Sequence, residues 1–126
     1  MKKYTPIYFN YSEFDSPDCK GSGFAISNKL VEKLDHLRSL YKKPIFVNSG
    51  VRTKAHNLLV GGLNDSSHLD GLAVDIHAAS STDIYQLVYY AFKVGFTRIG
   101  IKKNMIHLDI DKSKPAFVLW TYDKIK

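Results

Sequence analysis

The sequence predicts an α+β fold: a single domain in which an antiparallel sheet is flanked by helices. Two stretches, 28–41 and 82–94, repeat apolar residues at helical spacing, whereas 73–77 and 105–110 alternate apolar and polar residues as half-buried strands do. The chain has 126 residues, of which 44% are hydrophobic, and this is enough for one core. We therefore expect residues 1–126 to form one domain.

Three helices are expected. The longest covers about 28–41, because Ser27 is a suitable N-cap and the segment carries one apolar stripe. The stripe consists of Leu30, Val31, Leu34, Leu37 and Tyr41. A short second helix is predicted over 53–59, before two glycines, and a third is predicted to begin with Ser81 or Thr82 as its cap.

Five short strands complete the predicted fold. An apolar run at 45–47 and the alternating segment 73–77 give the first two. Segments 98–101 and 105–110 flank a Lys-Lys-Asn turn and predict a β-hairpin. A last strand is expected over 117–120. The sum is a mixed α+β domain.

Composition limits the chemistry available to the chain. Cys19 is the single cysteine, which excludes an internal disulfide and a cysteine-rich structural zinc site. The net charge of +6 attracts polyanions, such as nucleic acid, an anionic membrane or an anionic cell wall, but the lysines are dispersed and do not select among them. The N-terminus shows no signal-peptide pattern, so we expect cytoplasmic synthesis without one.

Two motifs carry candidate metal ligands. Residues 66–75 read SSHLDGLAVD and residues 106–110 read IHLDI, so that His68, Asp75 and His107 supply two imidazoles and one carboxylate. This is the ligand set of a catalytic zinc site, in which water takes the fourth position. The sequence therefore predicts one zinc ion per chain.

Strand alternation supports the convergence of these ligands. Asp75 and His107 each lie on the polar face of a strand whose other face is apolar, and Gly71 permits a tight turn that brings His68 over the same groove. The pattern Ile-His-Leu-Asp-Ile is also that of an ordinary half-exposed strand. Convergence in space decides between the two interpretations.

The motifs resemble those of the zinc D-alanyl-D-alanine carboxypeptidase family, which includes phage cell-wall endopeptidases and shares its fold with the hedgehog signalling domain. Every fixed position of the family signature, Ser-x-His-x-x-Gly-x-Ala-x-Asp, is filled in 66–75, and a later strand histidine matches His107. Residues 48–62 look like the family's Ser-Gly-Tyr-Arg segment with its His-Asn and Gly-Gly, although Val51 replaces the aromatic residue. The resemblance covers about 45–110.

The resemblance implies a role for each matching position. The implied zinc ligands are His68, Asp75 and His107. Arg52 matches the arginine that binds substrate and stabilises the oxyanion, and Ser66 and Asn57 match positions that hydrogen-bond the substrate.

One position departs from the family pattern. Family members place a catalytic Asp or Glu three residues before the last histidine ligand, where this chain has Asn104, and an amide does not accept a proton. Asp109 shares the strand face of His107, so it is our first candidate for the general base; it can equally orient the imidazole. His77 and Asp111 are further candidates.

The resemblance favours a zinc peptidase that hydrolyses peptide bonds in peptidoglycan stem peptides, as a D,D-carboxypeptidase or an endopeptidase, with zinc-activated water attacking the scissile carbonyl. The expected partners are peptidoglycan peptides, with no nucleic acid and no membrane, and the expected state is a monomer. A role in phage lysis or in a virion fits a wall peptidase without a signal peptide. The alternative is a non-catalytic, zinc-containing module that binds cell wall or a protein. A nucleic-acid binder is a weaker alternative, because the chain lacks a recognised binding motif.

Overall fold

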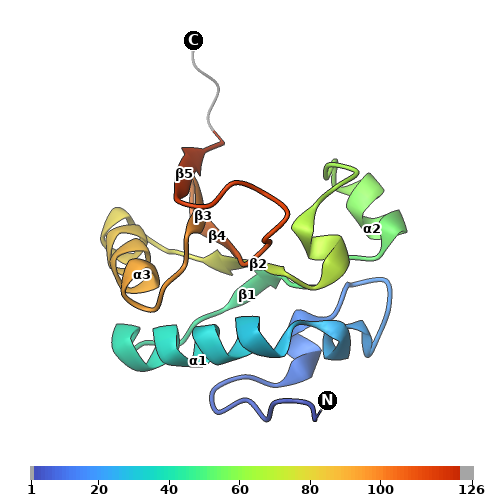
Figure 1. Cartoon of the computed structure of the whole chain (residues 1–126), viewed down its shortest axis with the longest axis horizontal. Coiled ribbons are helices and arrows are strands. Elements are labelled where there is room, and N and C mark those ends of the chain that lie inside the picture. Colours follow the sequence, from blue (N-terminus) through green and yellow to red (C-terminus); the bar gives the residue numbers. More distant parts are fainter. Residues whose placement is uncertain (1, 123–126) are drawn as a thin grey trace.

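The computed structural model describes residues 2–122 and shows an α+β fold in which helices surround a five-stranded sheet (Figure 1). The α-helices are α1 (Asn28–Tyr41), α2 (Lys54–Leu59) and α3 (Ser81–Lys93). The strands are β1 (Val47–Ser49), β2 (Ala73–His77), β3 (Arg98–Lys102), β4 (Met105–Asp109) and β5 (Val118–Thr121). Three short 3₁₀ helices are η1 (Tyr11–Phe14), η2 (Ser22–Ala25) and η3 (Ser67–Asp70). The predicted fold class is confirmed.

The sheet has the strand order β1-β2-β4-β3-β5. The first four strands pair antiparallel, as the sequence predicts, but β5 runs parallel to β3. The expectation of a wholly antiparallel sheet is therefore wrong for this edge strand. After β4 the chain runs back along the sheet, so that β5 enters beside β3 in the same direction. Their pairing starts where the Val118 amide donates to the Thr97 carbonyl at 3.0 Å.

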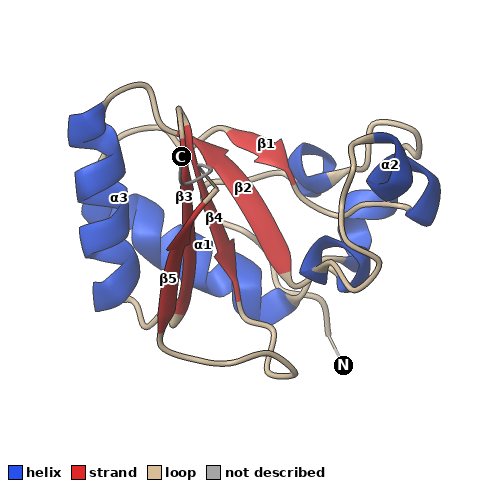
Figure 2. Cartoon of the chain, turned by 90° about the horizontal axis from the view of Figure 1, so that it is seen from above, coloured by secondary structure: helices blue, strands red, loops and turns tan. Residues whose placement is uncertain are grey.

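The core lies on one face of the sheet. Alternate residues of the central strands are fully buried there, among them Val74, Ile76, Ile106, Leu108 and Ile99. Buried apolar residues of α1 and α3 join the same cluster. Seen from above, the strands stand in the middle, with α3 and α2 at opposite sides (Figure 2). Because successive side chains of a strand point to opposite faces, the polar residues of these strands lie on the other face of the sheet.

Local signals mostly place the elements as expected. Ser27 caps α1 and accepts a hydrogen bond from the Leu30 amide at 3.4 Å, and Thr53 caps α2. The cap of α3 is Ser80 and neither Ser81 nor Thr82, so the helix begins slightly earlier than predicted. The prediction of a first strand over 45–47 is wrong in its bounds: β1 covers Val47–Ser49, since its ladder pairs Val47 with Ile76 and Ser49 with Asp75. None of the helices between residues 2 and 122 has the length and apolar character that a membrane span requires.

Candidate metal centre

Three side chains meet on the polar face of the sheet. His68, Asp75 and His107 are all buried, and each offers a ligand atom within 4.8 Å of the others. Asp75 of β2 lies directly opposite His107 of β4 in the antiparallel ladder, and Nδ1 of His107 is 2.9 Å from Oδ1 of Asp75. Nε2 of His68 is 3.3 Å from Oδ2 of the same carboxylate. Residues far apart in the sequence thus converge.

The backbone before β2 fixes the orientation of His68. Ser66 caps the short helix η3 and its hydroxyl accepts from the His68 amide at 3.3 Å, while Gly71 ends the helix in the left-handed region at φ 69°. Nδ1 of His68 lies 2.7 Å from the Gly50 carbonyl, which is an acceptor only, so Nδ1 carries the proton. In the neutral ring that a metal requires, Nε2 would then present its lone pair on the side of Asp75.

His107 lies between two carboxylates. Nδ1 faces Asp75, and Nε2 lies 2.7 Å from Oδ2 of Asp109. Burial alone would lower the pKa of His107, but the hydrogen bonds to Asp109 and Asp75 and their charges raise it above its ordinary value. A carboxylate at the far nitrogen of a histidine is the arrangement that orients metal-binding imidazoles.

The charge of Asp75 is favoured in the same cluster. Burial alone would raise the pKa of this carboxyl, but the hydrogen bonds from His107 and His68 and their positive charges hold it well below its usual range. Arg52 adds a further contact, with Nη2 3.2 Å from Oδ2 of Asp75. Asp75 is therefore available as an anionic oxygen ligand at neutral pH.

Asp109 lies behind His107 and is enclosed. Its exposed fraction is 1%, and both of its oxygens have partners. Oδ1 accepts from Nε of Arg98 at 2.7 Å and from the Asp111 amide at 3.1 Å, and Oδ2 faces His107. Of the two roles that the sequence leaves open for Asp109, this position favours the orientation of the imidazole over proton transfer to a substrate.

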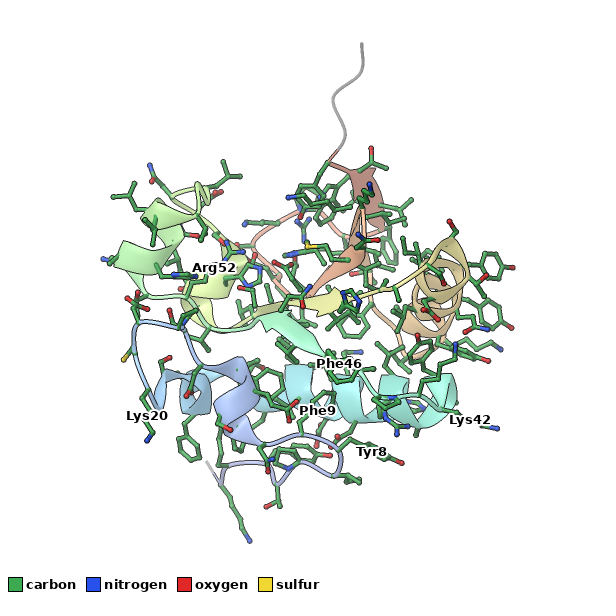
Figure 3. All side chains as sticks on the ribbon, turned by 180° about the vertical axis from the view of Figure 1, so that it is seen from behind. Tyr8, Phe9, Lys20, Lys42, Phe46 and Arg52 are labelled. Carbon is green, nitrogen blue, oxygen red and sulfur yellow. The ribbon has the colours of Figure 1, made fainter. Side chains whose placement is uncertain are left out.

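Arg52 is held on the other side of the cluster, and Figure 3 labels it beside α2. Nε of Arg52 donates to the Ser49 hydroxyl at 3.1 Å, and Nη1 donates to Oδ1 of Asn57 at 3.2 Å. Asn57 is itself buried and donates to the Leu63 carbonyl at 2.9 Å. The structure thus places Asn57 as a support for the guanidinium, and Ser66 as a helix cap, while both lie next to the cluster.

The other candidates for the base lie apart from these contacts. His77 is exposed at the end of β2, and Asn104 is exposed in the β3–β4 turn at φ 63°. Asp111 is buried, but it accepts hydrogen bonds from Ser67 at 2.7 Å and from Ser113 at 2.6 Å. In the part of the chain described, neither His77 nor Asp111 contacts the convergent ligands, and Asn104, which replaces the family's carboxylate, does not contact them either.

Sequence reasoning overlooked the side chains that surround His107. Arg98 pairs with Asp109, and the Trp120 ring lies 5.5 Å from the His107 ring between centroids. In the sequence Trp120 reads mainly as a core or rim residue, with the lining of a sugar-peptide groove as the alternative. Its position beside His107 depends on strand pairing across the sheet, which is not visible there. The alternation of side chains along β3, which places Arg98 on the polar face, was the signal that could have indicated this contact.

The donor chemistry fits a zinc ion. Two neutral imidazole nitrogens and one carboxylate oxygen are the protein ligands of hydrolytic zinc sites, and here they face one another across a few ångströms. The imidazole protons needed for this are already directed away, to Gly50 and Asp109. The fold and the site define a class of protein, the zinc metallopeptidases.

Comparison with known proteins agrees with this class. A family model described as Peptidase M15 matches residues 7–111, and the chain belongs to this family. Over 104 residues the chain is 36% identical to the zinc D-Ala-D-Ala carboxypeptidase of Streptomyces albus G, an alignment that covers 75% of this chain and 40% of that protein. The chain thus spans less than half the length of the curated relative. The resemblance drawn from the sequence is confirmed.

Proposed function

We propose that the protein is a zinc-dependent peptidase that cleaves peptide bonds in the stem peptides of peptidoglycan. The observation that carries the proposal is the convergence of His68, Asp75 and His107 beside Arg52. Support for the substrate comes from the relative, which is named for a D-Ala-D-Ala carboxypeptidase activity. The net charge of +6 also suits an anionic wall.

The three ligands would hold the metal, which supplies Lewis-acid activation of water and polarisation of the scissile carbonyl. Both imidazoles must be neutral to bind it, so acid releases the metal. Arg52 provides a fixed positive charge next to Asp75, where its guanidinium can donate to the oxygen that becomes negative as the carbonyl is attacked. Asn57 and Ser49 restrict the guanidinium to this position.

Asp109 acts in this proposal as a positioning residue. Its carboxylate accepts the Nε2 proton of His107, which directs Nδ1 toward Asp75, and Arg98 holds the carboxylate in turn. The role of general base, which the sequence assigns first to Asp109, stays a prediction. The variant Asp109→Asn separates the two roles, as set out below.

The function is tested by incubating the purified, zinc-loaded protein with muropeptides across pH 6–9 and analysing the products by mass spectrometry. We expect one peptide bond of the stem to be cut by the wild-type protein and not by His68→Ala. Which bond is cut, the terminal D,D bond or a cross-link, is read from the product masses. Identical behaviour of the two proteins, with no bond cut, overturns the proposal.

A second candidate is a zinc-containing binding module without catalysis. It is favoured by Asn104, which stands where the family has a carboxylate, and by the enclosed position of Asp109. This candidate requires one zinc per chain and stable retention on purified cell walls with no change in the muropeptide profile. Release of soluble peptide from the same walls contradicts it.

A further inference from the structure

The polar face of the sheet continues beyond the metal centre to an aromatic pair. The strand register aligns Asp75, His107, Gly100 and Trp120 in one row across β2, β4, β3 and β5. Residues of such a row point to the same face. Arg52 contacts Asp75 at one end of the row, and Trp120, at the other end, lies beside His107, so the two residues lie on opposite sides of the ligands.

Gly100 leaves the space that the aromatic rings occupy. A methyl group at this position would lie 2.8 Å from the Trp120 ring and 2.8 Å from the Tyr122 ring. The two rings therefore lie directly on the β3 backbone, with centroids 6.3 Å apart. A Cβ at this position would force the two rings to move, because real Cβ atoms do not approach ring atoms so closely.

Trp120 is held on several sides. Its ring lies 5.5 Å from His107, and the guanidinium of Arg98 lies over it at 5.1 Å. The same Arg98 pairs with Asp109, which holds the other side of His107. Trp120 is thus fixed relative to the ligand histidine by the network that orients this histidine.

The Tyr122 ring packs beside Trp120 on this face, and its side chain remains reachable from solvent. The residue is 44% exposed. Burial of the phenol raises its pKa, a hydrogen bond with Trp120 lowers it, and the charges of Asp75 and Asp109 raise it again, against a lowering by Arg52. The net shift is upward, so the hydroxyl keeps its proton at neutral pH and is a donor.

We propose that Trp120 and Tyr122 form a substrate-binding wall opposite Arg52, in which Tyr122 donates a hydrogen bond to the bound peptide and the Trp120 ring packs against its apolar side chains. The inference rests on the proposed function in taking a peptide as the ligand. Peptide carbonyls accept from a phenol, and small methyl side chains such as those of alanine pack on an indole face. The family match ends at residue 111, so the wall lies outside it.

The chain offers a direct probe of this wall. Trp120 is its one tryptophan, so intrinsic tryptophan emission reports on the wall alone. The zinc-loaded protein is mixed rapidly with a disaccharide pentapeptide ending in D-Ala-D-Ala, and emission is followed before the first turnover. We expect a saturable change in emission. Mass spectrometry of the same mixtures records cleavage independently.

Two variants and a matched control sharpen the experiment. Tyr122→Phe keeps the ring and removes only the hydroxyl, so we expect the dissociation constant to rise about three- to tenfold with zinc content unchanged. Tyr85→Phe is the matched control, since Tyr85 is 72% exposed on α3, and it should change nothing. Gly100→Ala should displace both rings, shift the emission of the free protein and weaken binding.

The outcomes separate the wall from the catalytic function. Cleavage by wild type with unchanged emission, and equal binding by Tyr122→Phe, overturns the wall and leaves the peptidase standing. A saturable emission change that Tyr122→Phe weakens, without cleavage of the pentapeptide or of cross-linked muropeptides, supports the wall and overturns the peptidase. Calorimetry that detects no binding of the pentapeptide overturns the wall.

Discussion

The two faces of β2 and β4 share one backbone and differ in what their side chains do. On one face, Val74, Ile76, Ile106 and Leu108 are fully buried against the helices. On the other, polar groups are buried as well, but each of them is matched by a charge or a hydrogen bond. In the described residues, no buried side-chain nitrogen or oxygen is left without a partner.

This difference separates stability from chemistry. The apolar face stabilises the fold through the area that it removes from water. The polar face keeps ionisable groups in fixed positions, which costs desolvation and is compensated only while the network is complete. Substitutions on the two faces should therefore fail in different assays.

The largest effect is expected on the polar face, from His68→Ala. Loss of a direct ligand should lower zinc affinity and peptidase activity by more than about 100-fold, the upper range for residues that only support a ligand. Metal content is measured by elemental analysis after gel filtration. His36→Ala, an exposed histidine of α1, is the control. A full zinc equivalent on the His68 variant contradicts the assignment.

Leu108→Ala on the apolar face should act on folding instead. Leu108 is fully buried, and its truncation should reduce the free energy of unfolding by about 2–5 kcal/mol, through lost burial and the cavity that remains. Urea denaturation measures the loss. Leu119→Ala, at an exposed position on the edge strand β5, should cost much less. The fraction of Leu108→Ala that folds should still bind one zinc. Loss of zinc from the folded variant would contradict the separation of stability and metal binding between the two faces.

Asp109→Asn tests the buried carboxylate that lies behind the ligand His107. A positioning role predicts that zinc affinity falls about 10–100-fold, with most of kcat restored once the site is saturated with metal. The role of base predicts the reverse, with zinc retained and kcat reduced about 100-fold or more. Metal titrations and steady-state kinetics on one preparation distinguish these results.

The smallest effect is expected at the Ser67–Asp111 hydrogen bond. Burial alone would raise the pKa of Asp111, but hydrogen bonds from Ser113 and Ser67 hold it below its ordinary value. A lowered folded-state pKa contributes stability above the unfolded value of about 3.9, and this stability is lost as pH falls through the folded value. Ser67→Ala should cost about 1–2 kcal/mol at pH 7, and less at pH 3.

Urea denaturation of wild type and Ser67→Ala at the two pH values checks this expectation. Ser39→Ala, an exposed serine of α1 whose hydroxyl donates to the His36 carbonyl, controls for the loss of a hydroxyl. An equal cost at both pH values would show that the carboxylate of Asp111 is not the group involved.

The sequence predicts features that depend on neighbouring residues better than features that depend on residues far apart in the chain. Ser27 and Thr53 identify helix starts because a cap acts within one turn, and the alternation in 73–77 and 105–109 identifies strands for the same reason. The ligand motif was visible because His68 and Asp75 are close in sequence. The expected convergence with His107 depended on the pairing of β2 with β4, which alternation suggests and only the fold provides.

Features that depend on pairing across the sheet escaped the sequence. The parallel direction of β5 follows from the path of the chain after β4, and no residue of 117–120 encodes it locally. The enclosed position of Asp109 depends on Arg98, eleven residues earlier on the neighbouring strand. The contact of Asn57 with Arg52 is local in sequence, and the substrate role that the resemblance implies for Asn57 stays a prediction.

The N-terminal segment is hydrogen-bonded to both ends of the peptide stretch that carries His68. The Val51 amide donates to the Phe14 carbonyl at 2.8 Å, next to the Gly50 carbonyl that holds the imidazole, and the Ser27 amide donates to the Gly71 carbonyl at 2.9 Å. We therefore expect metal binding and the docking of residues 14–27 to be thermodynamically linked, since each favours the same arrangement. Zinc should accordingly slow amide hydrogen exchange in residues 14–27, so that the protection of these amides from solvent reports metal occupancy.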